Sequence, residues 1–181
     1  MASGLDTYAR KVVEALQFTE STPPCTIERA AEFLLEIDAE ANKIMLVGNG
    51  GSAAIASHIA VDLCKTCGIR AMALNDPSML TCLSNDYSFD EVFSKQVEYH
   101  TEPNDALIAI SSSGKSKNIL NAVRTAAPLG ANLITLSGFE SDNPLREMGT
   151  INFYVPSMEY GVVEIAHLTI LHAIADAARV R

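Results

Sequence analysis

Five short apolar runs, each the length of a β-strand, alternate with helical segments along most of the chain. The runs are KIMLV (43–47), RAMAL (70–74), ALIAI (106–110), NLITL (132–136) and INFYV (151–155). Strands that alternate with helices form βαβ units, whose strands lie parallel in one sheet. Because the runs are nearly continuous in apolar residues, we expect helices to cover both faces of that sheet. The pattern therefore predicts an α/β fold.

Helical periodicity marks both ends of the chain. Apolar residues recur at helical spacing in 6–18 and 27–41, and the breaker STPPC (21–25) separates these two segments. They predict a leading helical hairpin over 1–41, and residues 162–178 predict a long apolar last helix. The chain has 181 residues, of which 48% are hydrophobic, enough for one substantial core. We expect a single domain over 1–181, with an α/β core and last helix in 42–181.

Charge and hydropathy exclude two classes of partner. The formal net charge is −9, so the chain lacks the positive field that gathers nucleic acid or anionic membranes. No apolar run reaches the roughly 18 residues of a membrane span, and the first residues are amphipathic and acidic, unlike a signal peptide. We therefore expect a cytoplasmic protein that binds neither nucleic acid nor membrane. Its four cysteines are expected to be reduced.

Two predicted strands end in loops of small polar residues. KIMLV runs into GNGGS (48–52), and ALIAI runs into SSSGKS (111–116). Ligands of parallel sheets bind outside the carboxyl ends of strands, where a helix N-terminus offers free N–H groups to an anion. Glycine lets the backbone approach the ligand, and serine donates hydrogen bonds without charge. Either loop alone fits a tight turn with serine caps equally well, but two such loops favour a phosphate site.

Spacing argues against the common nucleotide motifs. A P-loop ending in GKS needs a glycine where this chain has Ala109. GNGGSA has the alanine variant of the dinucleotide fingerprint, but no acidic residue follows the second strand in the usual way. The loops therefore favour a phosphorylated ligand of another kind.

Five segments carry a resemblance to a known family. They are VGNGGSAAIASH (47–58), LSNDYSF (83–89), ISSSGKSKN (110–118), LITLSGFESDNPL (133–145) and VEIAHLTILH (163–172). Together they resemble sugar isomerase (SIS) domains and, among these, the phosphoheptose isomerase family. The resemblance implies a flavodoxin-like three-layer sandwich with a five-stranded parallel sheet, and a homotetramer with active sites at subunit interfaces. It also implies conversion of sedoheptulose 7-phosphate to D-glycero-D-manno-heptose 7-phosphate.

The resemblance assigns roles residue by residue. The implied substrate contacts are Asn49, Gly50, Gly51, Ser52, Asn85, Asp86, Ser111, Ser112, Ser113, Ser116 and Glu164. Many family members bind zinc through a helix His, a Glu four residues on, and a Gln and a His eight residues apart on the last helix. These positions carry His58, Asp62, Glu164 and His172 here. The resemblance thus implies a Zn²⁺ site in which two of four ligands differ from the family.

The same residues can be interpreted without the family. His58 and Asp62 are four residues apart, so they share a helix face and fit a metal chelate, an acid and base, or a plain surface pair. Glu164 lies in an apolar helix, where an unpaired carboxylate is costly, and His172 two turns on could partner it. His167 points away from His172 and is expected in the core or an interface.

Three further residues are interpreted as non-functional. His100 is expected to be solvated in a polar loop. Cys64 and Cys67 form a C-x-x-C, but no second pair accompanies it, so neither a redox nor a zinc role is favoured.

Ketose–aldose interconversion needs a base for a carbon proton and a group that moves a proton between the oxygens. By resemblance, Asp62 or Glu164 is the base, His172 the acid and His58 a ligand. Two alternatives stay open: an isomerase of a related ketose phosphate, and a non-catalytic SIS adaptor such as a tetramer that binds a replication initiator. His172 favours the enzyme, because the adaptor branch usually loses the last-helix histidine.

Overall fold

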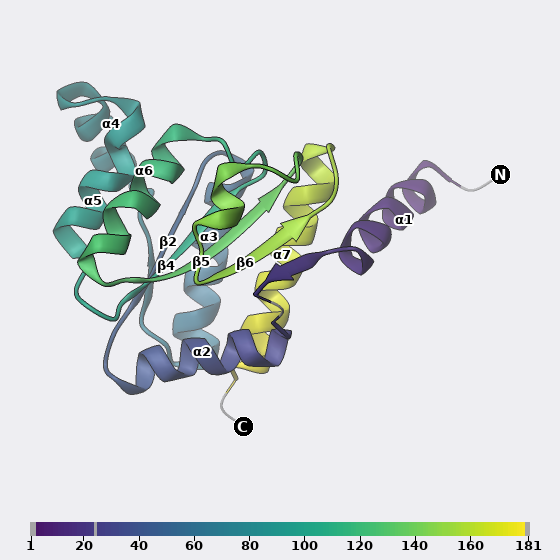
Figure 1. The fold of residues 1–181 in the computed structure, drawn as a ribbon, viewed down its shortest axis with the longest axis horizontal. Coiled ribbons are helices and arrows are strands. Elements are labelled where there is room, and N and C mark those ends of the chain that lie inside the picture. The colour runs from purple at the N-terminus through teal and green to yellow at the C-terminus, as the bar shows by residue number, and fades with distance from the viewer. Residues whose placement is uncertain (1–2, 24, 180–181) are drawn as a thin grey trace.

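The computed structural model describes residues 3–23 and 25–179 and has the α/β architecture expected from the sequence (Figure 1). A six-stranded sheet forms its middle layer, in the order β1-β6-β5-β4-β2-β3. The parallel strands are β2 (Ile44–Gly48), β3 (Ala71–Ala73), β4 (Ala106–Ser111), β5 (Asn132–Gly138) and β6 (Ile151–Val155). Their order, with the second parallel strand outside the first, is that of flavodoxin-like folds.

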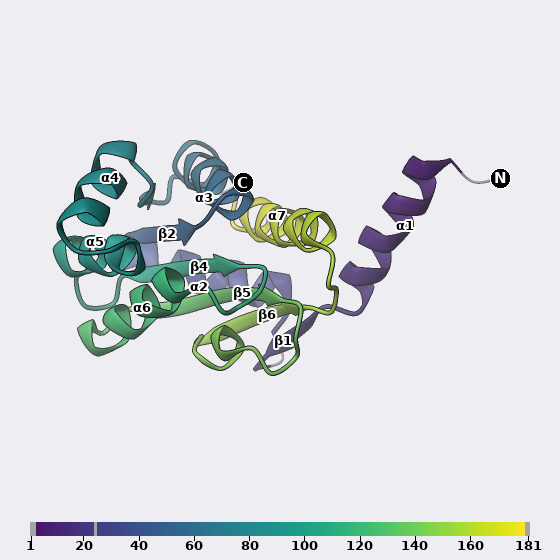
Figure 2. The same cartoon turned by 90° about the horizontal axis from the view of Figure 1, so that it is seen from above.

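Helices cover both faces of this sheet. They are α1 (Gly4–Gln17), α2 (Ile27–Ala39), α3 (Gly51–Asp62), α4 (Pro77–Asp86), α5 (Val92–His100), α6 (Lys117–Ala126) and α7 (Tyr160–Ala177). Figure 2 shows α3 and α7 on one side of the sheet and α6 on the other. Along β2, Ile44 and Leu46 enter the core beneath α2, α3 and α7, while Met45 and Val47 enter the core beneath α4, α5 and α6. Both faces of the strand are therefore buried, which explains its continuous apolar run.

The N-terminal region differs from the predicted hairpin. Both helices are present, but the short strand β1 (Glu20–Thr22) separates them and pairs antiparallel with β6. Each helix packs on α7, and α1 reaches outward from the rest of the fold (Figure 1). The prediction of five strands is corrected to six. The sequence EST has no apolar alternation, so only its pairing with β6 identifies it as a strand.

The topology places both polar loops at one point. Strand order reverses between β2 and β4, which are hydrogen-bonded neighbours, and the two loops follow the carboxyl ends of these two strands. A crevice outside such a reversal is the usual ligand site of open parallel sheets. Within the described ranges, no helix combines the length and the apolar character needed to cross a bilayer.

Candidate active site

The glycine loop turns sharply from β2 into α3. A Cβ atom on Gly48 would lie 2.5 Å from the carbonyl carbon and oxygen of Ser52, so only glycine fits there. Gly50 has φ of 53° and precedes the first residue of the helix, Gly51. Ser52 is buried. The residues that the sequence singled out thus form a tight strand-to-helix turn with the N-terminus of α3 behind it.

The serine loop joins β4 to α6. Ser111 Oγ donates to Ser116 Oγ at 3.3 Å, and the backbone N–H of Lys115 donates to Ser113 Oγ at 3.2 Å. Gly114 has φ of 60°, and a Cβ there would lie 1.9 Å from Oδ1 of the buried Asn143. The loop is therefore shaped both by its own hydroxyls and by Asn143 packed against its glycine.

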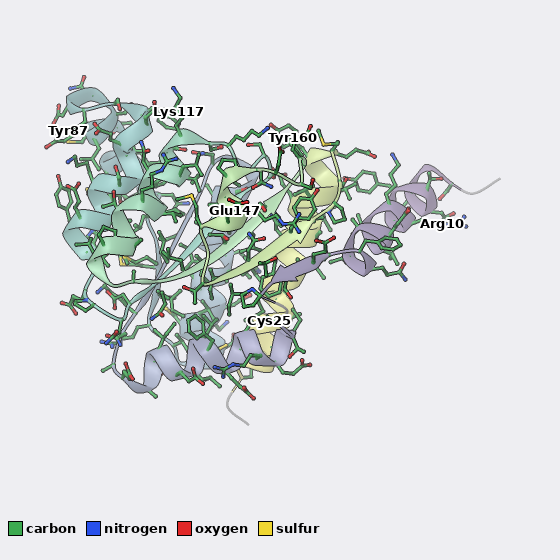
Figure 3. The ribbon with its side chains drawn as sticks, viewed as in Figure 1. Arg10, Cys25, Tyr87, Lys117, Glu147 and Tyr160 are labelled. Carbon is green, nitrogen blue, oxygen red and sulfur yellow. The ribbon has the colours of Figure 1, made fainter. Side chains whose placement is uncertain are left out.

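The two loops enclose a pocket of about 150 Å³. Its lining residues are Asn49, Ser52, Ile110, Ser111, Ser112, Ser113, Ser116, Tyr160 and Glu164. We call this the serine pocket. Its described lining contains no lysine or arginine. Tyr160 begins α7 near the carboxyl ends of the strands (Figure 3), and its ring meets Phe139 edge to face at 4.7 Å between centroids. The sequence did not single out Tyr160 as a pocket residue.

Glu164 brings a carboxylate into this pocket. It is half-buried on α7, and a Cβ on Gly51 would lie 2.5 Å from its carboxyl carbon and both oxygens. The carboxylate thus sits against the first turn of α3, where the helix dipole favours negative charge. Among the described residues, Glu164 has no ion-pair partner.

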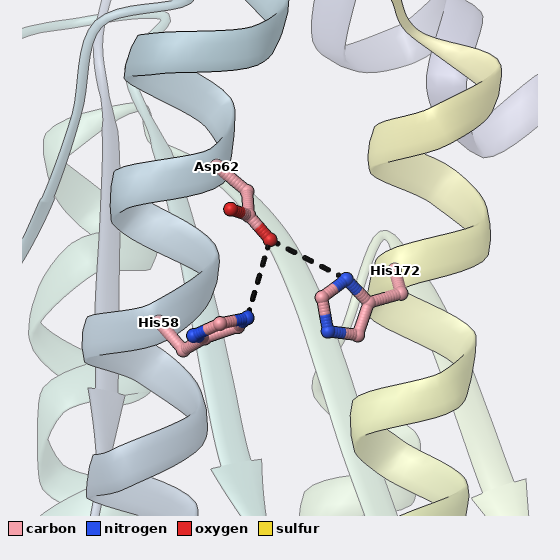
Figure 4. Close-up of side chains that lie close together, drawn as sticks. All are labelled: His58, Asp62 and His172. Carbon is pink, nitrogen blue, oxygen red and sulfur yellow. Dashed lines mark ion pairs between the residues drawn. The ribbon is translucent and has the colours of Figure 1, made fainter.

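A second cluster bridges α3 and α7 (Figure 4). His58 Nε2 and His172 Nδ1 each lie 3.4 Å from Oδ2 of Asp62, and the two imidazole rings are 5.0 Å apart between centroids. Side-chain exposure is 58% for His58, 29% for Asp62 and 40% for His172, so solvent reaches the cluster. We call these three residues the histidine–aspartate cluster.

The cluster has donor atoms suited to a metal ion. One ligand atom from each residue lies within 4.8 Å of the others. Two imidazole nitrogens and one carboxylate oxygen are a set that zinc accepts in catalytic sites, where three protein ligands leave one position open. The residues present therefore fit the predicted metal.

Glu164 does not join this cluster. It precedes His172 by eight residues, which is about 12 Å along a helix at 1.5 Å per residue. The structure thus brings together three of the four predicted ligands and places the fourth in the serine pocket. Asn85 and Asp86 are also separate: they end α4, are exposed, and bond to each other, with Asn85 Nδ2 donating to Asp86 Oδ1 at 2.9 Å.

The other two histidines and the C-x-x-C cysteines belong to neither of the two sites. His167 is fully buried, its Nε2 lies 3.1 Å from the carbonyl oxygen of Ser137, and burial lowers its pKa to about 4. His100 is the last residue of α5 and is half-buried. The expectation that it lies solvated in a polar loop was therefore wrong. Cys64 and Cys67 each donate to a different backbone carbonyl and do not pair.

Comparisons with known proteins agree on one family. Residues 7–138 match the family model described as SIS domain. The chain is 38% identical over 172 residues to the phosphoheptose isomerase of Aliarcobacter butzleri, covering 92% of this chain and 87% of the relative. It is 34% identical over 179 residues to that of Shewanella loihica, covering 94% and 90%. The solved phosphoheptose isomerase from Neisseria gonorrhoeae superposes with a TM-score of 0.82 at 33% identity, covering 95% and 93%.

Proposed function

The chain belongs to the SIS domain family, among the phosphoheptose isomerases, and we propose that it converts sedoheptulose 7-phosphate to D-glycero-D-manno-heptose 7-phosphate. It is an isomerase by this membership. The observation that carries the substrate proposal is the separation of two sites along one pair of helices: a hydroxyl-lined pocket at one end and an acid–base cluster at the other.

The serine pocket supports a phosphate-binding role. Its lining offers hydroxyls from both loops, and the pocket lies beside the N-terminal turns of α3 and α6. Hydroxyls and helix N-termini bind phosphate without cationic side chains. Glu164 at the same end would contact sugar hydroxyls next to the phosphate.

The distance between the serine pocket and the histidine–aspartate cluster favours a long sugar. Ten residues separate Ser52 from Asp62 on α3, and eight separate Glu164 from His172 on α7, about 15 and 12 Å of helix. Six carbon–carbon bonds of an open heptose, at about 1.2 Å each when extended, span ~7 Å before the phosphate is added. An extended heptose 7-phosphate therefore covers more of the distance between the serine pocket and the histidine–aspartate cluster than a shorter ketose phosphate does, which favours the longer sugar.

This geometry suggests different roles for the carboxylates of Asp62 and Glu164. Oδ2 of Asp62 faces both histidines, which leaves Oδ1 to accept a proton from C1 of the open ketose. As that proton leaves, His172 donates a proton to the C2 oxygen, which gives the enediol. Asp62 then returns its proton to C2, and the proton of the C1 hydroxyl passes back to His172, which gives the aldose. In this scheme Glu164 positions substrate rather than reacting.

His58, Asp62 and His172 would hold the proposed Zn²⁺. When bound, such an ion supplies polarisation of the sugar carbonyl. Asp62 would then use one oxygen toward the ion and keep the other for the carbon proton, and His172 would hold the ion through Nδ1, which faces Asp62, and keep Nε2 for the sugar oxygens. The proposal also includes a cytoplasmic homotetramer, as the family resemblance implies.

The deciding experiment is incubation of the purified protein with sedoheptulose 7-phosphate, fructose 6-phosphate and ribulose 5-phosphate, with aldose formation followed by NMR. We expect turnover of the heptose and at least tenfold lower kcat/KM for the shorter sugars. Preference for a shorter ketose phosphate would instead support the alternative, an isomerase of a related ketose phosphate. No turnover of any sugar, with phosphosugar binding retained, would favour the adaptor.

A further inference from the structure

We propose that Asn118 is a positioning residue that holds the two loops of the serine pocket together through a reciprocal amide pair with Asn49. The proposal rests on the proposed function only in taking the serine pocket as the phosphate site. Asn118 does not line that pocket, so any effect on the ligand must pass through Asn49 and the loops.

The two side-chain amides donate hydrogen bonds to each other. Asn49 Nδ2 donates to Asn118 Oδ1 at 2.9 Å, and Asn118 Nδ2 donates to Asn49 Oδ1 at 2.9 Å. Asn118 is buried, and its Oδ1 also accepts the backbone N–H of Ile119 at 3.0 Å, which favours the same orientation of the amide. Each side chain thus uses one donor and one acceptor in a ring of two hydrogen bonds.

Asn49 lies in the glycine loop, and Asn118 follows the serine loop. The backbone carbonyl of Asn49 accepts the N–H of Ser52 at 2.9 Å, at the start of α3. Asn118 lies two residues after Ser116, the N-cap of α6. The pair therefore ties the N-terminus of α3 to the N-terminus of α6.

The amide pair lies where the two loops of the serine pocket begin to diverge. The ladder between β2 and β4 ends at the pairing of Gly48 with Ile110, and the two loops diverge beyond that point. The amide pair is a cross-link just past the end of the ladder, at the reversal of strand order where the ligand binds. It keeps Asn49, which lines the pocket, in one orientation before the ligand arrives. Such preorganisation improves affinity by reducing the ordering that binding requires.

The test is Asn118→Ala, with Asn121→Ala as the matched control on the same helix. Asn121 Nδ2 donates to the carbonyl of Asp90 at 3.0 Å, so the control also loses an asparagine hydrogen bond, but one that does not reach either ligand loop. The dissociation constant for inorganic phosphate, measured by calorimetry, is compared with KM and kcat for sedoheptulose 7-phosphate and with the thermal midpoint.

We expect Asn118→Ala to raise both the phosphate dissociation constant and KM about tenfold, the equivalent of ~1.4 kcal/mol. The value of kcat should stay within about threefold, because the pair supports ground state and transition state alike. Asn121→Ala should lower the thermal midpoint comparably without raising either binding constant. In an Asn49→Ala background, Asn118→Ala should have little further effect, since its partner is already gone.

Equal phosphate dissociation constants and KM values in the Asn118→Ala and Asn121→Ala variants would overturn the proposal. Asn118→Ser, which keeps one hydrogen-bonding group, supports the same comparison if the alanine variant does not fold. Phosphate binding is measured without turnover, so a protein that isomerises none of the sugars but still binds phosphate through Asn118 would overturn only the proposed function. A wild type that binds no phosphate would overturn this proposal.

Discussion

The described lining of the serine pocket contains hydroxyls and no cationic side chain, which leads to a prediction about substitutions at its serines. Ser113 and Ser116 line the pocket, whereas Lys115 between them is exposed and does not. A hydrogen bond to a charged group contributes about 1.5–3 kcal/mol. The double variant Ser113→Ala with Ser116→Ala should therefore weaken phosphosugar binding by well over tenfold. Lys115→Ala should change it less than threefold. Calorimetric titration with sedoheptulose 7-phosphate measures both, and the reverse order would contradict a phosphate site without cationic side chains.

His167 should make stability depend on pH. Burial lowers its folded pKa from 6.5 to about 4, so the unfolded chain binds more protons between these two values. The free energy of unfolding should therefore fall as pH drops through this window, by up to about 3 kcal/mol from this residue alone. His167→Gln keeps an N–H group able to reach the carbonyl of Ser137 and removes the titration.

Urea unfolding at pH 7 and pH 5 tests the effect of His167. The wild type should lose more stability between these values than His167→Gln does. The control His100→Gln removes a histidine from the end of α5 and should keep the wild-type difference. An equal difference in wild type and His167→Gln would show that other groups cause the pH dependence.

At the scale of elements, apolar patterning predicted all five parallel strands, including the partly exposed β3, and missed the short antiparallel strand β1. β4 reads ALIAI and lies in the middle of the sheet, so its composition alone reveals it. β1 has three residues on the sheet edge, and its identity depends on β6, which is more than a hundred residues away. Local sequence carries no signal for such a pairing. The predicted helical hairpin failed for the same reason, because α7 is the partner of both helices.

The candidate site shows the same limit. The spacing of His58 and Asp62 predicted their pairing, because residues four apart share a helix face. The arrival of His172 beside them required the packing of α7 on α3, and periodicity alone did not predict it. The expectation that His172 could partner Glu164 neglected the rise of the helix, because eight residues span about 12 Å. Asn118 was missed altogether, since an asparagine in the first turn of a helix has many ordinary explanations.

The contact between α3 and α7 leads to a prediction about metal. If Zn²⁺ binds the histidine–aspartate cluster, it links the two helices and stabilises the folded chain, by about 2.7 kcal/mol when zinc is at 100 times its dissociation constant. Zinc should therefore raise the thermal midpoint of the wild type. His58→Ala and His172→Ala should abolish this rise, and His100→Ala should preserve it.

Elemental analysis and chelation complete the test of the metal. Purified protein should contain zinc, lose activity on chelation and regain it when zinc is restored. A metal-free preparation that turns over fully and gains neither activity nor stability from zinc would rule the site out. The three residues would then act as a metal-independent acid and base set.

At the scale of the whole molecule, α1 is the element that a single chain leaves least covered. It packs on α7 through one side, yet Leu5, Val13 and Phe18 in or beside it are 77%, 52% and 63% exposed. Apolar side chains on an outward-reaching helix are typically covered by subunit contacts. We therefore expect self-association, and the family resemblance implies a tetramer, so light scattering at micromolar concentration should return four times the 19.4 kDa of one chain. A 19.4 kDa species under these conditions would contradict the homotetramer.

Disrupting the outer face of α1 should separate assembly from folding. The double variant Leu5→Asp with Val13→Asp adds charge to two exposed positions that support no core contact in the single chain, so its secondary structure should persist while the tetramer dissociates. Leu129→Asp, at a 37% exposed residue in the turn after α6, is the control and should leave the mass unchanged. The family resemblance implies active sites at subunit interfaces, and on that proposal turnover should fall with the tetramer although no site residue has changed. A dissociated variant that kept full activity would mean that the serine pocket and the histidine–aspartate cluster of one chain suffice for the reaction.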